Sequence, residues 1–340
     1  MQEQQQEENS SKSDEYCFSD SDDTTIEKIN LCKIQDKDLI AMYEEKLSIK
    51  QRIKVGENDV EKDEEKPMVS LHIKKDKNVK SIVLATVLGV NTELCIQKCK
   101  NLTLESSPLS IMLLKVNNCG LTSTAGIQNM RKTQFINLEN NKISDLSGIQ
   151  HRFSTMHLNL ANNYIVCLKN LADLENLISL QLMNNKISNL EPLKNLKNLD
   201  KLFLSNNKIK SLEGLEGLTA IRELYLANNV IIDIEPLKNM TQLVVLHIYE
   251  NAIENIDVLG ELKELKILYL QENRIENIDV LKNLVDLEEL DVSYNEVEKV
   301  EALKDLANLN SVDLSCNFIS DFSPIKHHKC FEKYNLEDQE

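Results

Sequence analysis

The sequence predicts an α/β solenoid, a curved stack of short units with a concave parallel β-sheet and 3₁₀ or short helical turns on the convex side. The first observation is an asparagine that recurs every 22 residues. The second is a fixed apolar frame around it, Leu-x-x-Leu-x-Leu-x-x-Asn-x-Ile-x-x-Leu-x-x-Leu. A unit this short can bury its apolar face only against its neighbours, so we expect function on a surface. The repeating residues are Asn141, Asn163, Asn185, Asn207, Asn229, Asn251, Asn273, Asn295 and Asn317.

The residues before each asparagine alternate as they do in a β-strand. In the unit of Asn207, Leu202 and Leu204 are separated by one residue. Successive side chains of a strand point to opposite faces, so the leucines should point inward and the residue between them outward. Each unit therefore contributes one short strand, and neighbouring strands form a parallel sheet.

The residues after each asparagine change to threefold spacing, as in Leu281, Leu284 and Leu287. This spacing suits a 3₁₀ or short helical turn on the side opposite the strands. Pro192 and Pro236 stand where such turns would begin, a position that needs no amide donor. Because the strand side is narrower than the turn side, the stack should curve with its strands on the inner wall.

The repeating asparagine should itself be structural. A buried amide must be paired, and the backbone groups of the bend after each strand are the nearest partners. We therefore expect these residues to stabilise the stack rather than to form a site.

The frame sets the domain boundaries. Weaker copies precede Asn141, one at Leu114 and Val116, one at Leu94 and Ile96, and the weakest at Leu71. We expect a solenoid of about eleven repeats over residues 67–325, since each repeat must stack on the next, and a short C-terminal tail over 326–340.

Residues 1–66 form an acidic N-terminal arm. They hold 19 acidic and 10 basic residues, more than half of the net charge of −16. So few apolar residues are present that we expect the arm to be largely disordered. A pattern near 38–53 favours a helix, either packed on the open end of the solenoid or unattached.

Several functional classes lack their sequence signals. No apolar run is long enough to span a membrane, and the N-terminus does not resemble a secretory signal. The eight cysteines show no paired framework or zinc spacing, so we expect a cytoplasmic or nuclear protein. Phosphate-binding glycine loops, H-E-x-x-H and G-x-S-x-G are absent, so we predict no enzyme and no cofactor. His327, His328 and Cys330 are close in sequence, but we interpret them as incidental rather than as a metal site.

The exposed residues of the inner wall are the candidate protein-binding site. Aromatic residues gather there, although they make up only 4% of the chain. Exposed aromatic rings beside carboxylates are typical of protein-binding hot spots, while the competing explanation is that such rings favour strands. The candidates are Phe203, Glu223, Tyr225, His247, Tyr249, Tyr269, Glu289, Asp291, Tyr294 and Asp313.

Charge indicates the kind of partner. From Asn251 onward the wall carries acidic residues and no base, so the partner should present a basic surface. Nucleic acid is excluded as a partner because its phosphates would be repelled. We expect no membrane partner and a chain that is monomeric on its own.

The period and the frame resemble the 22-residue leucine-rich repeat class to which the regulatory subunit of protein phosphatase 1 belongs. Lys201-Leu-Phe-Leu-Ser-Asn-Asn-Lys-Ile and Glu223-Leu-Tyr-Leu-Ala-Asn-Asn carry the resemblance, which covers about residues 90–325. It implies a leucine-rich repeat horseshoe whose concave row holds the phosphatase catalytic subunit. Tyr269 followed by Asp291 matches the order in that family, and Phe203 and Tyr225 are of the right kind.

Two departures from that family stand in the sequence. Asp313 occupies a position where the family has tryptophan, and the C-terminal capping motif is missing. The leading prediction is a non-enzymatic scaffold that regulates protein phosphatase 1. The alternative is a leucine-rich repeat scaffold of a cytoskeletal (axonemal) or splicing assembly, which would use the same wall for another partner.

Overall fold

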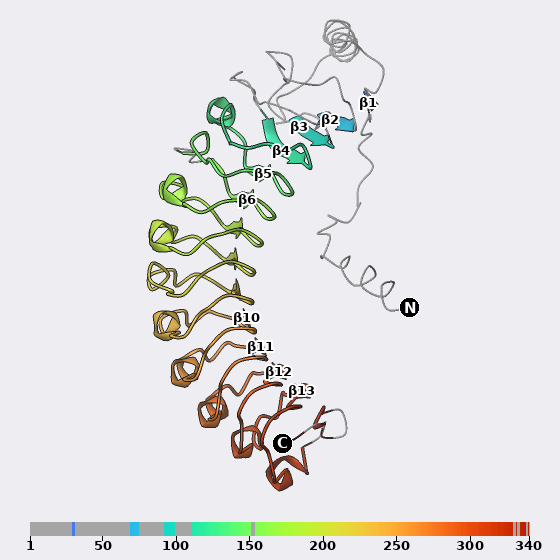
Figure 1. Ribbon diagram of the computed structural model, residues 1–340, viewed down its shortest axis with the longest axis vertical. Coiled ribbons are helices and arrows are strands. Elements are labelled where there is room, and N and C mark those ends of the chain that lie inside the picture. Colours follow the sequence, from blue (N-terminus) through green and yellow to red (C-terminus); the bar gives the residue numbers. More distant parts are fainter. Residues whose placement is uncertain are drawn as a thin grey trace, which may run out of the picture.

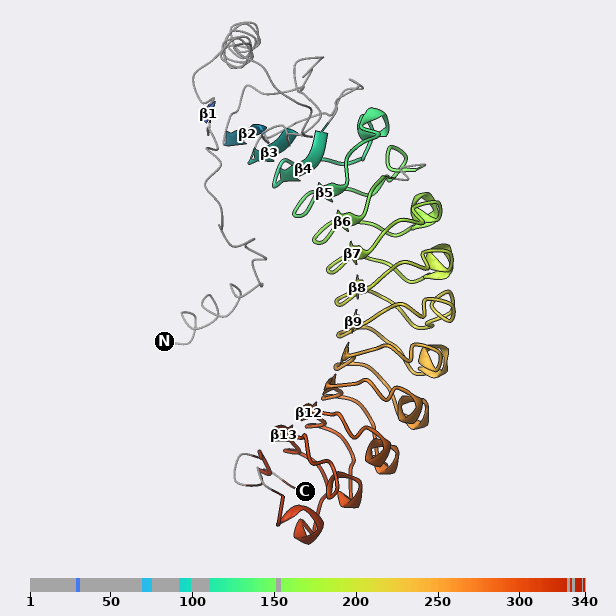
Figure 2. The ribbon, with the colours of Figure 1, turned by 180° about the vertical axis from the view of Figure 1, so that it is seen from behind.

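A computed structural model describes residues 29–30, 69–74, 92–98, 111–150, 154–328, 331, 334–337 and 339. Figures 1 and 2 show a curved stack with strands along its inner side and 3₁₀ turns along its outer side. Within the described residues, thirteen strands form one sheet in chain order. Each strand is parallel to the next. The predicted solenoid with a concave parallel sheet is confirmed.

Most of the strands are three residues long and overlap the Leu-x-Leu segments of the frame, each beginning one residue before the first leucine. The longer β2 lies where the weakest copy of the frame was expected. In chain order the strands are β1 Ile29–Asn30, β2 Val69–Lys74, β3 Thr92–Gln97, β4 Ile111–Asn117, β5 Phe135–Asn137, β6 His157–Asn159, β7 Ser179–Gln181, β8 Lys201–Phe203, β9 Glu223–Tyr225, β10 Val245–His247, β11 Ile267–Tyr269, β12 Glu289–Asp291 and β13 Ser311–Asp313.

Short 3₁₀ turns form the convex side, as the threefold spacing predicts. Pro192 and Pro236 lie in the first turn of η3 and η4, which confirms their expected place. The unit of Leu212 and Leu215 has a simple turn instead, with Gly214 at a φ of 100°. The 3₁₀ turns are η1 Ile127–Asn129, η2 Lys169–Leu171, η3 Glu191–Leu193, η4 Glu235–Leu237, η5 Asp257–Glu261, η6 Asp279–Asn283, η7 Glu301–Leu303 and η8 Ser323–Ile325.

The register of the sheet follows the 22-residue period, so equivalent residues of neighbouring units lie side by side. Leu180 pairs with Leu202, and Leu202 with Leu224. All three leucines are fully buried in one continuous hydrophobic core. The position after each of these leucines is half-buried and faces the concave side, which is where the candidate site residues lie.

The repeating asparagines tie successive units together. The Nδ2 of Asn229 donates to the carbonyl oxygens of Leu226, Ala227 and Leu204 at 2.9, 3.2 and 3.2 Å. Its Oδ1 accepts the amide of Ile209 at 3.0 Å, so one side chain bridges two units. The other eight repeat this pattern, which confirms the structural role predicted for them.

The segment expected as a C-terminal tail instead adds one more partial unit. Gln339 stands 22 residues after Asn317 and makes the equivalent hydrogen bonds in the last unit. Its Nε2 donates to the carbonyl oxygen of Leu314 at 2.9 Å, and its Oε1 accepts the amide of Ile319 at 3.1 Å. Tyr334 fills a buried slot of the frame, and Asn335 forms a parallel bridge with Asp313.

Two expectations fall mostly on residues that the structure does not describe. Of the arm over 1–66, only Ile29–Asn30 is described, and it pairs with β2. The helix considered near 38–53 lies outside the described residues.

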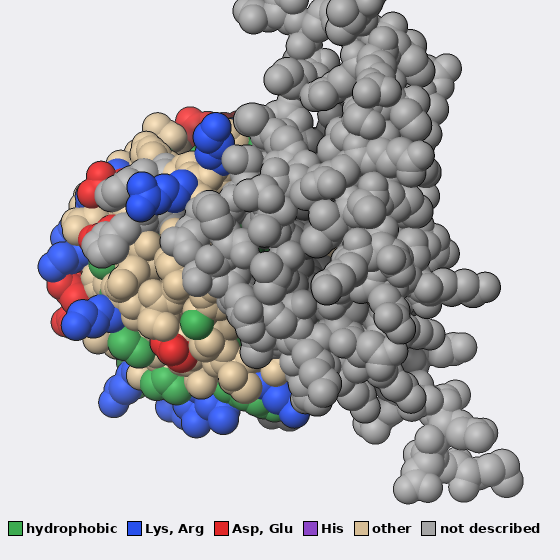
Figure 3. Space-filling view, turned by 90° about the horizontal axis from the view of Figure 1, so that it is seen from above, with side chains coloured by type: hydrophobic (Ala, Val, Ile, Leu, Met, Phe, Trp, Pro, Cys, Tyr) green, Lys and Arg blue, Asp and Glu red, His purple; other side chains and the backbone are tan. Residues whose placement is uncertain are grey.

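The described surface carries both signs of charge, with some hydrophobic side chains exposed among them (Figure 3). Figure 3 shows Lys and Arg side chains interspersed with Asp and Glu around the outer margin of the stack. Among the described residues, no helix has the length and apolar character needed to cross a bilayer.

We expect Asn229→Ala to lower the free energy of unfolding by about 1 to 3 kcal/mol, because the buried amide and carbonyl groups that Asn229 pairs would lose their partner. Chemical denaturation measures this loss. Asn239→Ala, on an exposed convex position, is the control and should leave stability unchanged. An Asn229→Ala curve that superimposes on the wild-type curve would contradict the structural role of the asparagine.

Candidate protein-binding site

Four rings form a continuous column along the concave wall, one from each of β8 to β11. The sheet register places Phe203 beside Tyr225, Tyr225 beside His247 and His247 beside Tyr269. The ring centroids are 4.6, 4.6 and 4.4 Å apart in that order, with the first and last pairs stacked. All four side chains are half-buried and lie on one face. We call Phe203, Tyr225, His247 and Tyr269 the ring column.

Carboxylates border the ring column on the side where the strands begin. Glu223 lies 2.7 Å from the Nζ of Lys201 and accepts the hydroxyl of Tyr225 at 3.4 Å. Glu289 accepts the hydroxyl of Tyr269 at 2.7 Å. These contacts fix the orientation of the two tyrosine rings, so the exposed ring faces are held in place before any partner binds.

His247 is kept neutral by its position inside the column. Burial lowers the pKa of His247 from 6.5 to about 4, and the negative charges of Glu289 and Glu223 only partly oppose this shift. A neutral imidazole can stack on Tyr269 as an aromatic ring without adding a positive charge to the wall.

The tyrosines of the wall keep their protons near neutral pH. Burial, the hydrogen bond to Glu289 and nearby negative charges raise the pKa of Tyr269 to about 12. Burial and the negative charge of Glu250 also raise the pKa of Tyr249, whose ring centroid is 6.4 Å from that of His247. Both phenols therefore present an apolar ring and a polar hydroxyl to a partner.

Two aspartates continue the column beyond Tyr269. The register places Asp291 beside Tyr269 and Asp313 beside Asp291. Burial and the charge of Asp313 raise the pKa of Asp291, whereas hydrogen bonds from Ser293 lower it. No ion pair within the described part of the chain involves either aspartate. A cation from a partner would therefore find two half-buried carboxylates beside an aromatic ring.

One predicted site residue lies apart from the column. Tyr294 occupies the bend after β12 at a φ of 54°, and its side chain is 59% exposed. Glu250 and Glu272 occupy the equivalent bends, also at positive φ. The strand is only three residues long, so period-two alternation does not extend to this position.

The sequence and the fold of this chain are similar to those of known proteins. The sequence matches the family described as Leucine Rich repeats (2 copies) at residues 197–239, 241–283 and 285–327. An internalin, InlF of Listeria monocytogenes, is 25% identical with a TM-score of 0.64, over 89% of this chain and 95% of that one. The matched residues are leucine-rich repeats, and the described part of the chain has the leucine-rich repeat fold.

Other solved leucine-rich repeat structures share the fold at lower identity. A leucine-rich repeat protein of Leptospira interrogans is 22% identical with a TM-score of 0.62, over 79% of this chain and 77% of that one. The plant peptide hormone receptor RGFR1, in complex with RGF2, is 18% identical with a TM-score of 0.62. That match covers 80% of this chain and 47% of the receptor chain. Comparison with curated proteins finds no match.

The concave wall includes polar residues that the sequence analysis missed. Ser293 and Ser315 donate hydroxyl hydrogen bonds to Asp291 and Asp313 at 2.7 and 2.6 Å. Asn335 donates to Asp313 at 2.9 Å. The repeated Asp-x-Ser at the ends of β12 and β13 was a usable signal, because Ser two residues after Asp commonly closes a local hydrogen bond.

The wall also holds a second, smaller stack near the N-terminal end. Phe135 and His157, on β5 and β6, stack with centroids 4.5 Å apart. They are in register with Lys201, two residues before the ring-column position of Phe203, and are separated from the column by β7, so they form a distinct cluster.

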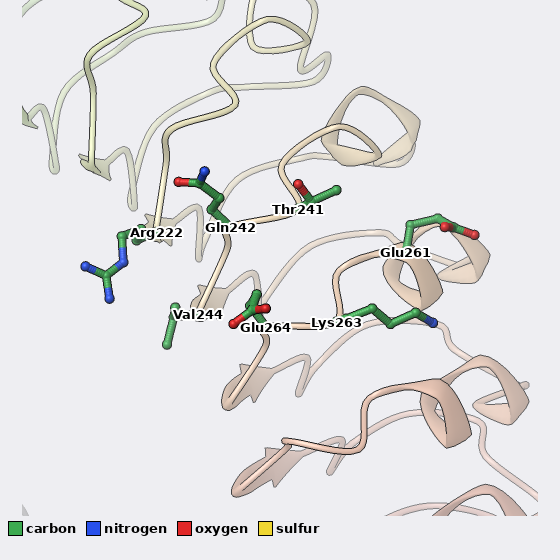
Figure 4. A pocket seen from close by; sticks show the side chains of 7 residues that line it. All are labelled: Arg222, Thr241, Gln242, Val244, Glu261, Lys263 and Glu264. Atoms are coloured by element: carbon green, nitrogen blue, oxygen red, sulfur yellow. The ribbon is translucent and has the colours of Figure 1, made fainter.

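The polar side chains that line a hollow on the side of the repeats do not point toward a common centre (Figure 4). The hollow encloses about 530 Å³ and includes Arg222 and Val244, which directly precede β9 and β10. Figure 4 shows that Arg222 and Lys263 extend in opposite directions, so its polar groups do not meet around one point. The hollow is lined by Arg222, Thr241, Gln242, Val244, Glu261, Lys263 and Glu264.

His328, in the C-terminal segment that also contains His327 and Cys330, has a structural role. Cys330 lies outside the described residues. The ring of His328 bonds the carbonyl oxygen of Leu306 through Nε2 at 2.8 Å and the hydroxyl of Tyr334 through Nδ1. Among the described residues, no three His, Cys, Asp or Glu side chains are grouped so that they could hold a metal ion.

We expect stability to fall as the pH drops from 6.5 toward about 4, because unfolded His247 takes up a proton that the folded ring does not. His247→Phe keeps the stack and removes this titration, so it should reduce the stability lost between about pH 7 and 5 by about 1 kcal/mol, a value discounted because the ring is partly solvated. Urea denaturation at the two pH values measures the difference. The exposed His327→Gln is the control, and equal losses in wild type and His247→Phe would contradict the assignment.

Proposed function

We propose that this protein is a non-enzymatic scaffold that docks a protein partner on its concave wall. The ring column carries this proposal, because four ordered rings run directly into Asp291 and Asp313. Half-buried aromatic rings in a fixed geometry lose little entropy when a partner covers them, which is typical of binding hot spots. The plant receptor of similar fold is seen with a peptide hormone, so the fold accommodates a polypeptide ligand.

The partner should place a basic surface on the late part of the wall. Asp291 and Asp313 form no ion pair among the described residues, and Glu289 adds a third carboxylate. The catalytic subunit of protein phosphatase 1 is the specific partner that we propose, with the chain as its regulatory subunit. The support is the sequence resemblance, in which Tyr269 and Asp291 hold matching positions.

The test is a binding measurement between the purified chain and the phosphatase 1 catalytic subunit. We expect combined Tyr225→Ala, Tyr269→Ala and Asp291→Ala substitutions to weaken binding by about 100-fold or more, since hot-spot truncations typically cost at least about 2 kcal/mol each. Phe135→Ala, at the separate stack of the same wall, is the matched control and should bind as the wild type does. Far-UV circular dichroism should show that all variants keep the fold.

Capture of partners from cell extract tests two claims separately, that the concave wall binds a protein and that this protein is the phosphatase. Recovery of axonemal or splicing components in place of the phosphatase, lost with the triple substitution, would keep the docking wall and reject the phosphatase. Capture that is insensitive to the triple substitution would reject the wall itself.

A further inference from the structure

A second surface runs along the flank of the solenoid, beside the concave wall. We call the repeating asparagines, Asn141 to Asn317, the asparagine ladder. The residue two positions after each ladder asparagine is buried, as Ile165 and Ile231 are, so the residues one and three positions after it point outward. The backbone there is held regularly, since the amide of Lys186 donates to the carbonyl oxygen of Ile165 at 2.9 Å. We call these two outward columns, over the units from Asn141 to Asn317, the asparagine flank.

Apolar side chains are concentrated on the asparagine flank. Seven large hydrophobic side chains among the described residues are exposed, and five of them lie here. Single exposed apolar residues are ordinary, but this concentration on one narrow surface indicates that something covers it. The five are Tyr164, Val166, Val230, Ile232 and Phe318, which are 42 to 55% exposed.

Charge on the asparagine flank is divided between its two halves. The half before Val230 carries lysines and no acid, and the half after Ile232 carries glutamates with one arginine. That arginine, Arg274, already lies 3.9 Å from Glu254. The lysines are Lys142, Lys186, Lys208 and Lys210, and the glutamates are Glu254, Glu276, Glu296 and Glu298.

We infer that the asparagine flank binds a second copy of this chain in an antiparallel dimer. The twofold axis would run from the concave to the convex side, between the units of Asn229 and Asn251. Such an axis keeps each column opposite the same column of the other copy and sets the basic half of one against the acidic half of the other. An interface of this kind is self-complementary, as a twofold dimer requires.

The position of the axis follows from which residues it brings together. Because units at equal distances from the axis face each other, Val230 lies opposite Ala252, and Tyr164 lies opposite Phe318. Lys186 meets Glu296 on the same column. In this column apolar residues meet apolar residues at the centre and at both ends, with Lys186 and Glu296 between them. In the other column Ile232 faces Glu254 and Val166 faces Ser320.

The next pair outward from the axis is less regular. Lys210 faces Glu276, while Lys208 faces Arg274. The contact between Arg274 and Glu254 reduces the repulsion between Arg274 and Lys208. Lys208 also lies in the column next to the one in which Lys210 faces Glu276.

A second copy explains more of this surface than a different partner does. An acidic polypeptide would cover the lysines but leave the glutamates in water, and a basic one would do the reverse. Only a partner with both halves in opposite order matches the whole flank, and this chain is such a partner. The dimer replaces the monomer expected from the sequence, and both concave walls would remain open on the same side.

The test is sedimentation equilibrium of the full chain over about 1 to 100 μM, the range in which modest interfaces dissociate. We expect a monomer–dimer equilibrium. Val230→Asp should raise the dimer dissociation constant by about 100-fold, because each dimer would bury two unpaired carboxylates. Val285→Asp is the matched control, since Val285 is 58% exposed but lies off this flank, and it should dimerise as the wild type does.

Charge reversal tests the antiparallel register. Lys186→Glu and Glu296→Lys should each weaken the dimer, and the two together in one chain should restore it, because the facing charges are exchanged. A monomer at every concentration would overturn the inference. A dimer that withstands Val230→Asp, or that the paired reversal does not restore, would also overturn it. Binding of a partner to the concave wall is measured in a separate assay, and the substitutions on the asparagine flank are not required to alter it.

Discussion

The structure depends on one interaction, the bridging of successive units by the amide of the ladder asparagine. Each bend after a strand exposes backbone carbonyl and amide groups that the neighbouring unit then shields from water. The side chain of Asn229 satisfies groups in its own unit and in the unit before it. Unpaired polar groups are costly in a dry interior, so the ladder is what allows a stack of leucines to have an irregular, turning backbone.

This constraint also fixes the functional surface. Because every unit is held in the same register, one outward position of each strand lines up with the next at the strand spacing of about 4.8 Å. Phe203, Tyr225, His247 and Tyr269 can stack only because the ladder removes sliding between units. A small change in the register would separate the rings and move Asp291 away from Tyr269.

The sequence was most informative where the chain is periodic. The Leu-x-Leu segments and the repeating asparagine predicted the strands and the buried pairing. The position between Leu202 and Leu204 predicted an outward, exposed Phe203, whereas stacking on Tyr225 leaves that side chain half-buried. The final unit was missed because Gln339 replaces asparagine with a longer side chain, and Tyr334 replaces a leucine. Tyr294, predicted to stand beside the outward column, lies in the bend after β12 because a three-residue strand turns before that position. The hydroxyl bond from Tyr269 to Glu289 depends on side-chain rotamers, which a one-dimensional pattern does not specify.

The bends after the strands carry a further consequence. From Asn118 to Asn228 every such position at positive φ is asparagine, which tolerates the left-handed conformation, whereas the next four are Glu250, Glu272, Tyr294 and Cys316. For ordinary residues this conformation costs about 1 to 2 kcal/mol each. The C-terminal half of the arc therefore has a lower free energy of unfolding than it would have with asparagine at these four bends. Its rim is where local opening under heat or denaturant should begin, ahead of the asparagine-lined half.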